Sequence, residues 1–188
     1  MELRNLPLTE RVRVCANRIA ESGPPALSGL FDLTATRLVR FATTITRNQH
    51  DAEDAVQAAL VKIADKPSLL CATAQPWHYL LRMVRNESLA ILRRKKRWSP
   101  SDGITDLLTR RMVDQLEQED EYRAIWLAMR TLPNDQSEVV VLKIWEDMTF
   151  AEIGSILSIS PSTAASRYRY AIEKLANRLR PEKSEAIF

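Results

Sequence analysis

Two signals for the start of an α-helix lie close together between residues 149 and 161. Thr149 and Glu152 have the spacing of a capping box, in which the threonine hydroxyl accepts from the backbone and the glutamate reaches back to cap it. Ser160 and Pro161 follow as an N-cap and a first helical residue, a position where the missing N–H of proline costs nothing. A short helix, a tight turn and a second helix are the pattern of a helix-turn-helix.

The second helix of this motif has two faces of different character. Its apolar face, which we expect to pack against the rest of the fold, comprises Ala164, Tyr168, Ala171 and Leu175. Its polar face comprises Ser162, Thr163, Ser166, Arg167, Tyr170 and Lys174. Small hydroxyl residues at a helix N-terminus can donate to phosphates or base edges, and an arginine can bind guanine through two hydrogen bonds. The polar face is therefore a candidate DNA-binding surface, the alternative being an ordinary helical hairpin whose polar face is solvated.

The remainder of the chain is also predicted to be helical. Apolar residues recur at helical spacing in two upstream stretches, Leu38 to Ile45 and Val56 to Ile63. The four glycines are not spaced as a phosphate-binding loop requires, and no period-two alternation is long enough for a sheet, so the fold class is all-α. We expect Asp51 to cap the helix of the second stretch. The breakers Gly23-Pro24-Pro25 are expected to set residues 1–25 apart as an N-terminal arm.

The cysteines and histidines exclude several kinds of site. The two residues of each type are scattered singly, so neither a four-ligand zinc site nor a Cys/His nucleophile is expected, and no cofactor or small-molecule substrate is indicated. No stretch approaches the ~18 apolar residues of a membrane span, so no membrane insertion is expected. The N-terminal residues carry charges and no apolar block, which favours a reduced, cytoplasmic protein.

The charges are distributed in blocks that the net charge of +3 conceals. Residues 82–97 contain seven basic residues and one acidic residue, whereas residues 106–121 contain six acidic and two basic ones. Such an asymmetry indicates one surface for a polyanion and another for a basic partner. The turn-rich stretch 98–103 between the two blocks reads as a domain boundary.

Two parts of the chain resemble bacterial sigma-70-family factors. The stretch from Leu132-Pro133 through Leu142, followed by the helix-turn-helix to Arg167, resembles the fourth conserved domain of that family. The stretch from Asp51 to Gln57, and the helix from Leu80 to Asn86 with the basic run after it, resemble the second conserved domain. Their order and separation fit the compact extracytoplasmic-function (ECF) type, which has these two helical domains joined by a linker.

The resemblance implies a division of the chain and a function for it. The second domain would span 26–97, an acidic linker 98–119, the fourth domain 120–181 and a tail 182–188, with the arm at 1–25 unassigned. The protein would bind core RNA polymerase and direct promoter-specific transcription initiation without catalysis of its own, recognising minus-ten and minus-thirty-five elements and assisting promoter melting. Many members of the family are held inactive by an anti-sigma partner, although this sequence identifies none. The linker would run through a basic channel of the polymerase, or else form the solvated face of a helix.

The resemblance also assigns roles to residues. Polymerase binding would fall to Glu53, Asp54 and Gln57, although acidic residues here also suit the positive end of a helix. Minus-ten binding would fall to Arg82, Arg85, Asn86, Arg93, Arg94, Lys95, Lys96 and Arg97. Minus-thirty-five binding would fall to Thr149, Ser162, Thr163, Ser166, Arg167, Tyr170 and Lys174. The loop 67–75 would receive an extruded base, with Trp77 and Tyr79 as its aromatic supports or, alternatively, as core residues.

The sequence departs from the family pattern at two positions and admits two other functions. Ala165 stands where the family often has a lysine, which removes one expected DNA contact, and Ser158 replaces a usual glycine in the turn. A free-standing helix-turn-helix regulator would bind operator DNA without polymerase but gives no role to residues 51–97. A small helical nucleic-acid enzyme would need a catalytic cluster, whereas His50 and His78 stand alone.

Overall fold

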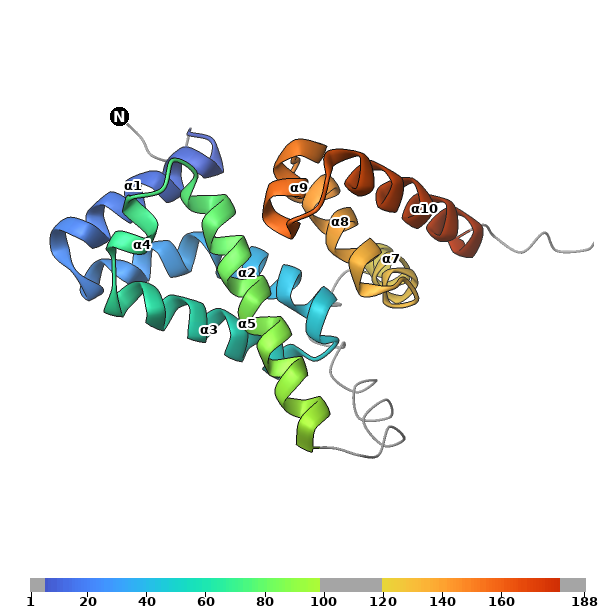
Figure 1. The fold of residues 1–188 in the computed structure, drawn as a ribbon, viewed down its shortest axis with the longest axis horizontal. Coiled ribbons are helices and arrows are strands. Elements are labelled where there is room, and N and C mark those ends of the chain that lie inside the picture. Colours follow the sequence, from blue (N-terminus) through green and yellow to red (C-terminus); the bar gives the residue numbers. More distant parts are fainter. Residues whose placement is uncertain (1–5, 99–119, 180–188) are drawn as a thin grey trace, which may run out of the picture.

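The computed structural model describes residues 6–98 and 120–179, and every regular element in these two ranges is helical. A first unit contains α1 (Leu8–Ser22), the 3-10 turn η2 (Pro24–Ala26), α2 (Leu27–Thr46), α3 (Gln49–Asp65), α4 (Ser68–Cys71) and α5 (Pro76–Trp98). A second unit contains α7 (Asp120–Arg130), α8 (Asn134–Ile144), α9 (Phe150–Leu157) and α10 (Pro161–Leu179). The two units lie side by side, as Figure 1 shows, with α2 and α5 facing α8 and α9. The all-α prediction is confirmed.

The core of the first unit lies between α2, α3 and α5, which pack against one another. The two apolar stretches expected from the sequence line it. Fully or almost fully buried are Leu38, Phe41, Ala42 and Ile45 from α2, and Val56, Ala59, Leu60 and Ile63 from α3. From α5 come Trp77, Leu80, Leu81 and Val84. The 3.6-residue period of these positions thus explains both the helices and the faces that they bury.

Residues 8–22 belong to this core rather than standing apart as an arm. Helix α1 packs against α2, α4 and α5 and buries Val12, Ala16 and Ile19. Gly23 ends the helix with a positive φ of 74°, which a residue without Cβ adopts easily, and η2 then turns the chain into α2. The breaker cluster therefore produces a helical hairpin, not a domain boundary.

The N-cap of α3 is Asn48, not Asp51. The Asn48 side chain accepts a hydrogen bond from the Asp51 backbone N–H at 3.0 Å. Asp51 lies inside the first turn, where its carboxylate is almost buried and accepts from Lys95 Nζ of α5 at 2.6 Å. The expectation of an aspartate cap is therefore wrong. Asn48, three residues upstream, is an equally good cap, and the Asp51 carboxylate binds Lys95 of the neighbouring helix instead.

The second unit forms a helix-turn-helix from α9 and α10, supported by α8. Helix α10 buries Ala164, Ala171 and Leu175 against α8 and α9, while the Tyr168 ring lies 5.8 Å from the ring of Phe150. The predicted packing face is therefore confirmed. The segment 99–119, which holds most of the predicted acidic linker, and the tail after residue 179 lie outside the described residues.

Candidate nucleic-acid interface

The capping box is present in full at the start of α9. The Thr149 backbone N–H donates to Glu152 Oε2 at 2.8 Å, the Thr149 hydroxyl donates to the same oxygen at 2.7 Å, and the Glu152 N–H donates to Thr149 Oγ1 at 3.3 Å. Thr149 was also a predicted DNA contact, and its hydroxyl is engaged in this box. The local sequence signal thus fixes where the first helix of the motif begins.

The turn between α9 and α10 approaches α9 very closely. Ser158 adopts the left-handed conformation (φ 59°, ψ 46°) and its N–H donates to Gly154 O, which ends the helix. A Cβ atom on Gly154 would lie 2.7 Å from the backbone oxygen of Ile159. The glycine is therefore required by the close approach of the turn backbone. The serine at 158 occupies the conformation that glycine favours.

A cluster of hydroxyl groups covers the N-terminus of α10. Ser160 Oγ accepts from the Thr163 N–H at 3.0 Å, and it lies 2.8 Å from both Ser162 Oγ and Thr163 Oγ1. These side chains are exposed, at the end of a helix whose dipole favours negative charge. The predicted N-cap is confirmed, and the arrangement can donate to an anion such as a phosphate.

The polar face of α10 continues beyond this cluster. Ser166, Tyr170 and Lys174 are exposed, and Tyr170 retains 50% of its accessible surface. Arg167 is half-buried, and its Nε lies 3.2 Å from Asp135 Oδ2 of α8. The structure thus brings six of the predicted minus-thirty-five residues to one face, with Thr149 set apart at the start of α9.

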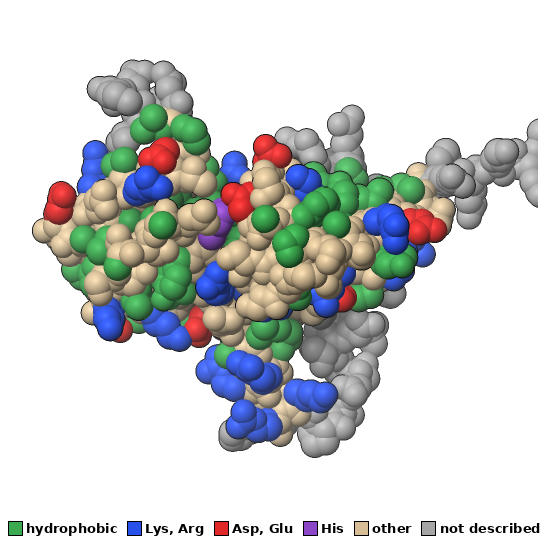
Figure 2. Space-filling model, turned by 45° about the horizontal axis from the view of Figure 1, so that its top comes forward, with side chains coloured by type: hydrophobic (Ala, Val, Ile, Leu, Met, Phe, Trp, Pro, Cys, Tyr) green, Lys and Arg blue, Asp and Glu red, His purple; other side chains and the backbone are tan. Residues whose placement is uncertain are grey.

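A second cationic surface lies at the C-terminal end of α5. Arg93, Arg94, Lys95, Lys96 and Arg97 are all exposed there, and they form the blue projection at the bottom of Figure 2. Lys95 is tied to Asp51, whereas no ion pair is recorded for the other four within the described residues. Clustered cations at a helix end bind phosphate backbones by releasing counterions.

The structure divides the eight predicted minus-ten residues of α5 into two groups. Asn86 and the five residues of the basic run are exposed, but Arg82 and Arg85 are half-buried and reach toward the second unit. Arg85 Nε donates to Glu138 Oε2 of α8 at 2.5 Å, and Arg82 donates to the Ser155 backbone oxygen of α9 at 2.9 Å. Burial raises the pKa of Glu138, whose side chain is almost inaccessible, and its bond to Arg85 opposes that rise.

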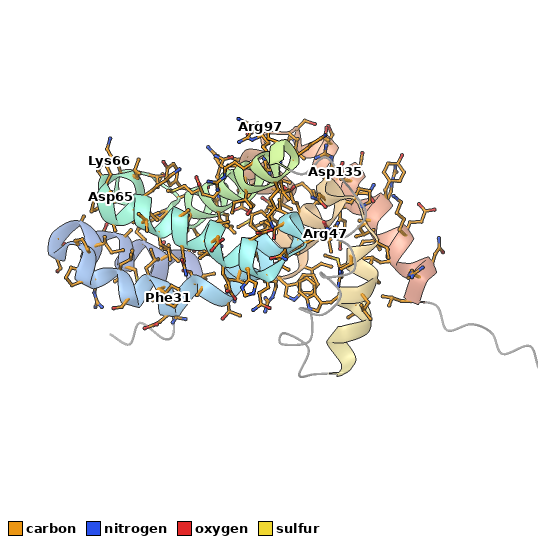
Figure 3. All side chains as sticks on the ribbon, turned by 90° about the horizontal axis from the view of Figure 1, so that it is seen from below. Phe31, Arg47, Asp65, Lys66, Arg97 and Asp135 are labelled. Atoms are coloured by element: carbon orange, nitrogen blue, oxygen red, sulfur yellow. The ribbon has the colours of Figure 1, made fainter. Side chains whose placement is uncertain are left out.

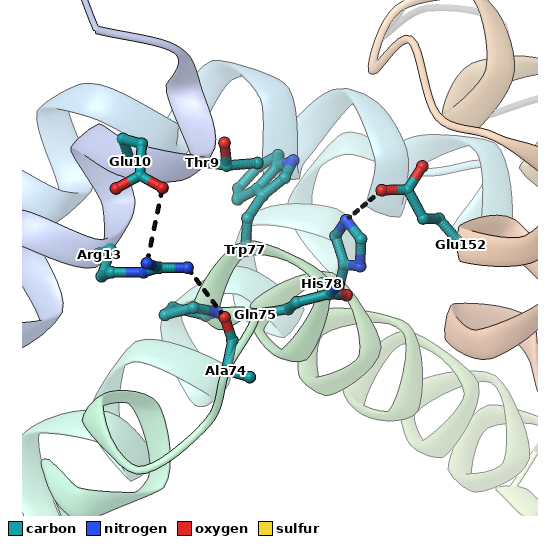
Figure 4. Close-up of a pocket in the computed structure, with 9 residues that line it drawn as sticks. Thr9, Glu10, Arg13, Ala74, Gln75, Trp77, His78 and Glu152 are labelled. Carbon is teal, nitrogen blue, oxygen red and sulfur yellow. Dashed lines mark hydrogen bonds and ion pairs between the residues drawn. The ribbon is translucent and has the colours of Figure 1, made fainter.

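The stretch 67–75, expected as a loop, contains the short helix α4, and the two aromatic residues that follow it differ in accessibility. Trp77 is only 2% exposed and belongs to the core, while Tyr79 is half-buried and packed against that core. The core-packing interpretation therefore holds for Trp77. Next to it, Figure 4 shows a recess of about 210 Å³ walled by α1, by residues 74–78 and by Glu152. Arg13 of α1 donates to the Ala74 carbonyl at 3.1 Å on one side of this recess.

On the other side of the recess, His78 Nε2 lies 3.6 Å from Glu152 Oε1. Burial lowers the pKa of His78, and the nearby carboxylate of Glu152 opposes this shift. A contact between the two units therefore bounds this side of the recess.

The predicted polymerase-binding residues lie on the first turns of α3. Asp54 and Gln57 are exposed, and Glu53 is half-buried and accepts from Gln49 Nε2 at 2.9 Å. Val61 extends the same side of the helix, since it follows Asp54 by seven residues and Gln57 by four, and it is 57% exposed. The sequence analysis did not single out Val61. The signal that could have found it is an apolar residue that does not share the helical spacing of the buried residues of α3.

Within residues 6–98 and 120–179, no group of three or more His, Cys, Asp and Glu side chains is placed to hold a metal ion. None of the helices described is long and apolar enough to cross a membrane.

The capping box makes the stability of the second unit depend on pH. Glu152 accepts hydrogen bonds from the Thr149 N–H and from the Thr149 hydroxyl, and these bonds lower the pKa of Glu152 below its ordinary value of 4.5. Glu152 then binds its proton more tightly in the unfolded state than in the folded state. The free energy of unfolding should therefore fall as the pH drops below 4.5 toward the lower pKa that Glu152 has in the folded state. Urea titrations at several pH values should show a steeper acid loss for the wild type than for Glu152→Gln. Identical acid slopes in the two proteins would contradict the role of this carboxylate.

Two family models match the chain. The one described as "Sigma-70 region 2" matches residues 30–98, and the one described as "Sigma-70, region 4" matches residues 122–186. The first match ends with α5, and the second covers the helix-turn-helix.

Curated relatives match along most of the chain. The RNA polymerase sigma-E factor of Streptomyces antibioticus is 27% identical over 150 residues, which cover 79% of this chain and 82% of that protein. The ECF RNA polymerase sigma factor SigL of Mycobacterium tuberculosis (strain H37Rv) is 26% identical over 152 residues, which cover 79% of this chain and 86% of that protein. The ECF sigma factor SigK of Mycobacterium sp. (strain KMS) is 25% identical over 179 residues, covering 90% and 91%.

Solved structures share the fold. The sigma factor RpoE in complex with the anti-sigma factor NepR, from Bartonella quintana, superposes with a TM-score of 0.65 at 20% identity, over 83% of this chain and 98% of that one. CnrH in complex with the cytosolic domain of CnrY superposes with a TM-score of 0.60 at 19% identity, over 88% of this chain and 94% of that one. At these identities the likeness shows the arrangement of helices alone.

Proposed function

Because the chain belongs to the sigma-70 family of RNA polymerase sigma factors, in its extracytoplasmic-function group, we propose that its two units divide promoter recognition between them. The polar face of α10 reads the minus-thirty-five element, and the basic end of α5 with the loop before it binds the minus-ten element and assists melting. The partners are core RNA polymerase and promoter DNA. The protein acts in the cytoplasm and has no catalytic activity of its own.

The observation that carries this proposal is the exposed N-terminus of α10. Ser162, Thr163 and Ser166 lie there as donors, with Arg167 next on the same face, at the end of the second helix of a complete helix-turn-helix. The second helix of this motif enters the major groove with its N-terminal residues on base edges. Position 165 holds a half-buried alanine, so the lysine contact that the family often has is missing from this helix.

The cationic end of α5 supports the minus-ten assignment. Five consecutive basic side chains are exposed on the last turns of the helix, at residues 93–97. A surface of this kind binds a nucleic-acid backbone without reading its sequence, so base recognition falls to the loop 67–75 and its surroundings. The two tasks thus fall to neighbouring segments of the chain, α5 and the stretch before it.

One exposed side of α3 supports the assignment of core-polymerase docking. Asp54, Gln57 and Val61 form an exposed strip in which a carboxylate, an amide and an apolar side chain lie one after another. Such a mixture suits a protein partner with basic side chains better than it suits DNA. The relatives in the two solved structures are bound to NepR, an anti-sigma factor, and to the cytosolic domain of CnrY, and we extend to this chain the expectation of an anti-sigma partner.

Transcription in vitro tests the function as a whole. The purified protein is added to core RNA polymerase on a library of promoters, and transcripts that start only in its presence are expected. Gel shifts with the same promoters are expected to require core polymerase. Specific duplex binding without polymerase, combined with no transcription, would instead support the free-standing regulator.

The minus-thirty-five assignment predicts the effect of a single substitution. Arg167→Ala should weaken binding of the holoenzyme to the upstream element by about 1–3 kcal/mol if the guanidinium contacts a guanine. Arg178, which is exposed in the last turn of α10, supplies the matched control, because Arg178→Ala removes the same charge at the opposite end of the helix from the proposed base contacts. Transcription from promoters with altered upstream sequences gives the readout. Unchanged discrimination between those promoters by Arg167→Ala would contradict the assignment.

A further inference from the structure

The first turn of α8 lies against α10 and contacts two cationic side chains of its polar face. Arg167 Nε lies 3.2 Å from Asp135 Oδ2. Lys174 Nζ donates to Gln136 Oε1 at 3.1 Å. Asp135, which is labelled in Figure 3, and Gln136 are neighbours near the start of α8, the helix that packs against α10. The helix that supports the motif thus reaches the proposed DNA-binding face.

Arg167 lies close to two carboxylates of α8. Asp135 and Glu138 are three positions apart, a spacing that places both on one side of the helix. Burial raises the pKa of Glu138, and its bond to Arg85 and the charge of Arg167 oppose that rise. Glu138 is almost inaccessible, whereas the Asp135 side chain retains 48% of its accessible surface. Asp135 is therefore the acidic partner of Arg167 that lies at the surface, where DNA would bind.

The contact with Asp135 leaves the end of the Arg167 guanidinium available. The contact is made by Nε, and the two terminal Nη groups donate no hydrogen bond to any residue that the structure describes. The Arg167 side chain keeps 30% of its accessible surface. An arginine binds guanine through two N–H bonds to O6 and N7, and the Nη groups can supply both. The side chain can thus contact Asp135 and a guanine at the same time.

We propose that Asp135 is a positioning residue for minus-thirty-five recognition, which holds Nε and so sets the direction in which Arg167 presents its Nη groups to a guanine. This inference rests on the proposed assignment of Arg167 to the upstream element. A free arginine side chain samples many rotamers, and the loss of that freedom opposes binding. Because Asp135 restricts those rotamers before DNA binds, the geometry that guanine requires is favoured over contacts with other bases.

The contact between Gln136 and Lys174 should have a different effect. Lysine is a point charge on a flexible stem, and a contact with phosphate carries no information about the base. Holding Lys174 in place therefore favours binding to every upstream sequence alike. Of the two contacts, only that of Asp135 with Arg167 should affect the choice of base.

Substitution of Asp135 in the holoenzyme tests this inference. The readout is transcription in vitro from promoters that differ only at the upstream base pair where Arg167→Ala loses discrimination. Asp135→Asn should reduce discrimination at that base pair about threefold to tenfold, because an uncharged amide holds Nε more weakly than a carboxylate. Asp135→Ala, which removes the acceptor altogether, should lose at least as much.

Asp147→Asn is the matched control. Asp147 is exposed between α8 and α9, in the left-handed conformation (φ 50°) that asparagine also adopts readily. Its side chain makes no hydrogen bond or ion pair with the described part of the chain, so the variant removes the same charge from the same unit without touching Arg167. Its discrimination should equal that of the wild type.

A double variant shows whether Asp135 acts through Arg167. In the Arg167→Ala background, Asp135→Asn should cause no further loss of discrimination, because the side chain that it positions is absent. A loss as large as in the wild-type background would mean that Asp135 contacts a base itself, and would overturn the positioning role. Circular dichroism of each variant verifies that it remains folded.

The remaining outcomes separate the inference from the proposed function. Wild-type discrimination in folded Asp135→Asn and Asp135→Ala would overturn the inference, even if Arg167→Ala behaves as expected. Increased discrimination in these variants would mean that Asp135 competes with DNA for Arg167, and would overturn it as well. If Arg167→Ala changes discrimination at no base pair, the assignment of Arg167 itself fails, and the inference fails with it.

Discussion

Replacing Trp77 by alanine should destabilise the first unit by about 3–5 kcal/mol, because the indole is 2% exposed in the core at the start of α5. The loss combines the transfer of the ring to water with the cavity that it leaves. Urea unfolding followed by circular dichroism measures it without depending on tryptophan fluorescence. Tyr79→Ala, at a half-buried position two residues on, should cost clearly less.

This substitution also decides between the two roles considered for the residue. If Trp77 stacked on an extruded base, alanine would weaken binding of minus-ten DNA and leave the free energy of unfolding nearly unchanged. Trp77→Phe helps to separate the cases, since phenylalanine retains an aromatic face but fills less of the core. An unchanged unfolding transition for Trp77→Ala would therefore contradict the core assignment.

Gly154→Ala should destabilise the second unit and impair minus-thirty-five recognition. The new Cβ would lie 2.7 Å from Ile159 O and 3.4 Å from Pro161 N, and both are backbone atoms that cannot rotate away. Forcing a methyl group into such a space typically costs about 1–3 kcal/mol. Because the displaced atoms belong to the turn that aims α10, we expect weaker use of the upstream element in transcription as well as lower stability.

Gly29→Ala supplies a matched control, because its expected effect on stability has the opposite sign. Gly29 lies exposed in the first turn of α2, and a Cβ there would meet nothing within 4 Å. Alanine in a helix is more favourable than glycine by roughly 0.5–1 kcal/mol, so this variant should be slightly more stable than the wild type. Equal effects of the two substitutions in thermal unfolding would mean that the turn at 158–160 relaxes more easily than its geometry suggests.

The elements of the fold followed from local sequence signals to a large extent. The apolar spacing in α2 and α3, the capping box at Thr149 and the Ser160-Pro161 start of α10 all act between residues three or four positions apart. Interactions of that range are the ones that a helix itself brings together. The polar face of α10 could be predicted for the same reason, since the helix alone decides which of its side chains share a side.

Local signals failed where two candidates competed or where a distant segment intervened. Asn48 and Asp51 were both acceptable caps, and the contact of Asp51 with Lys95 on α5 decided between them. The need for Gly154 came from the returning turn, and a pattern of apolar residues says nothing about how close a backbone oxygen approaches. Gly23 with its prolines indicated a break, yet the helix before it is held by its apolar face, so the break became a hairpin.

The helices, their buried faces and the two clusters of proposed DNA-binding residues could all be predicted from the sequence, because each depends on neighbours along one helix. How those residues are used depends on the packing between helices. Arg85 meets Glu138 across 53 positions of sequence, and Arg37 meets Glu146 across 109. Contacts at such separations depend on how whole helices pack, and no periodicity within a helix encodes them. For that reason the basic residues of α5 read as one block in the sequence, whereas the fold directs Arg82 and Arg85 to the second unit and residues 93–97 to solvent.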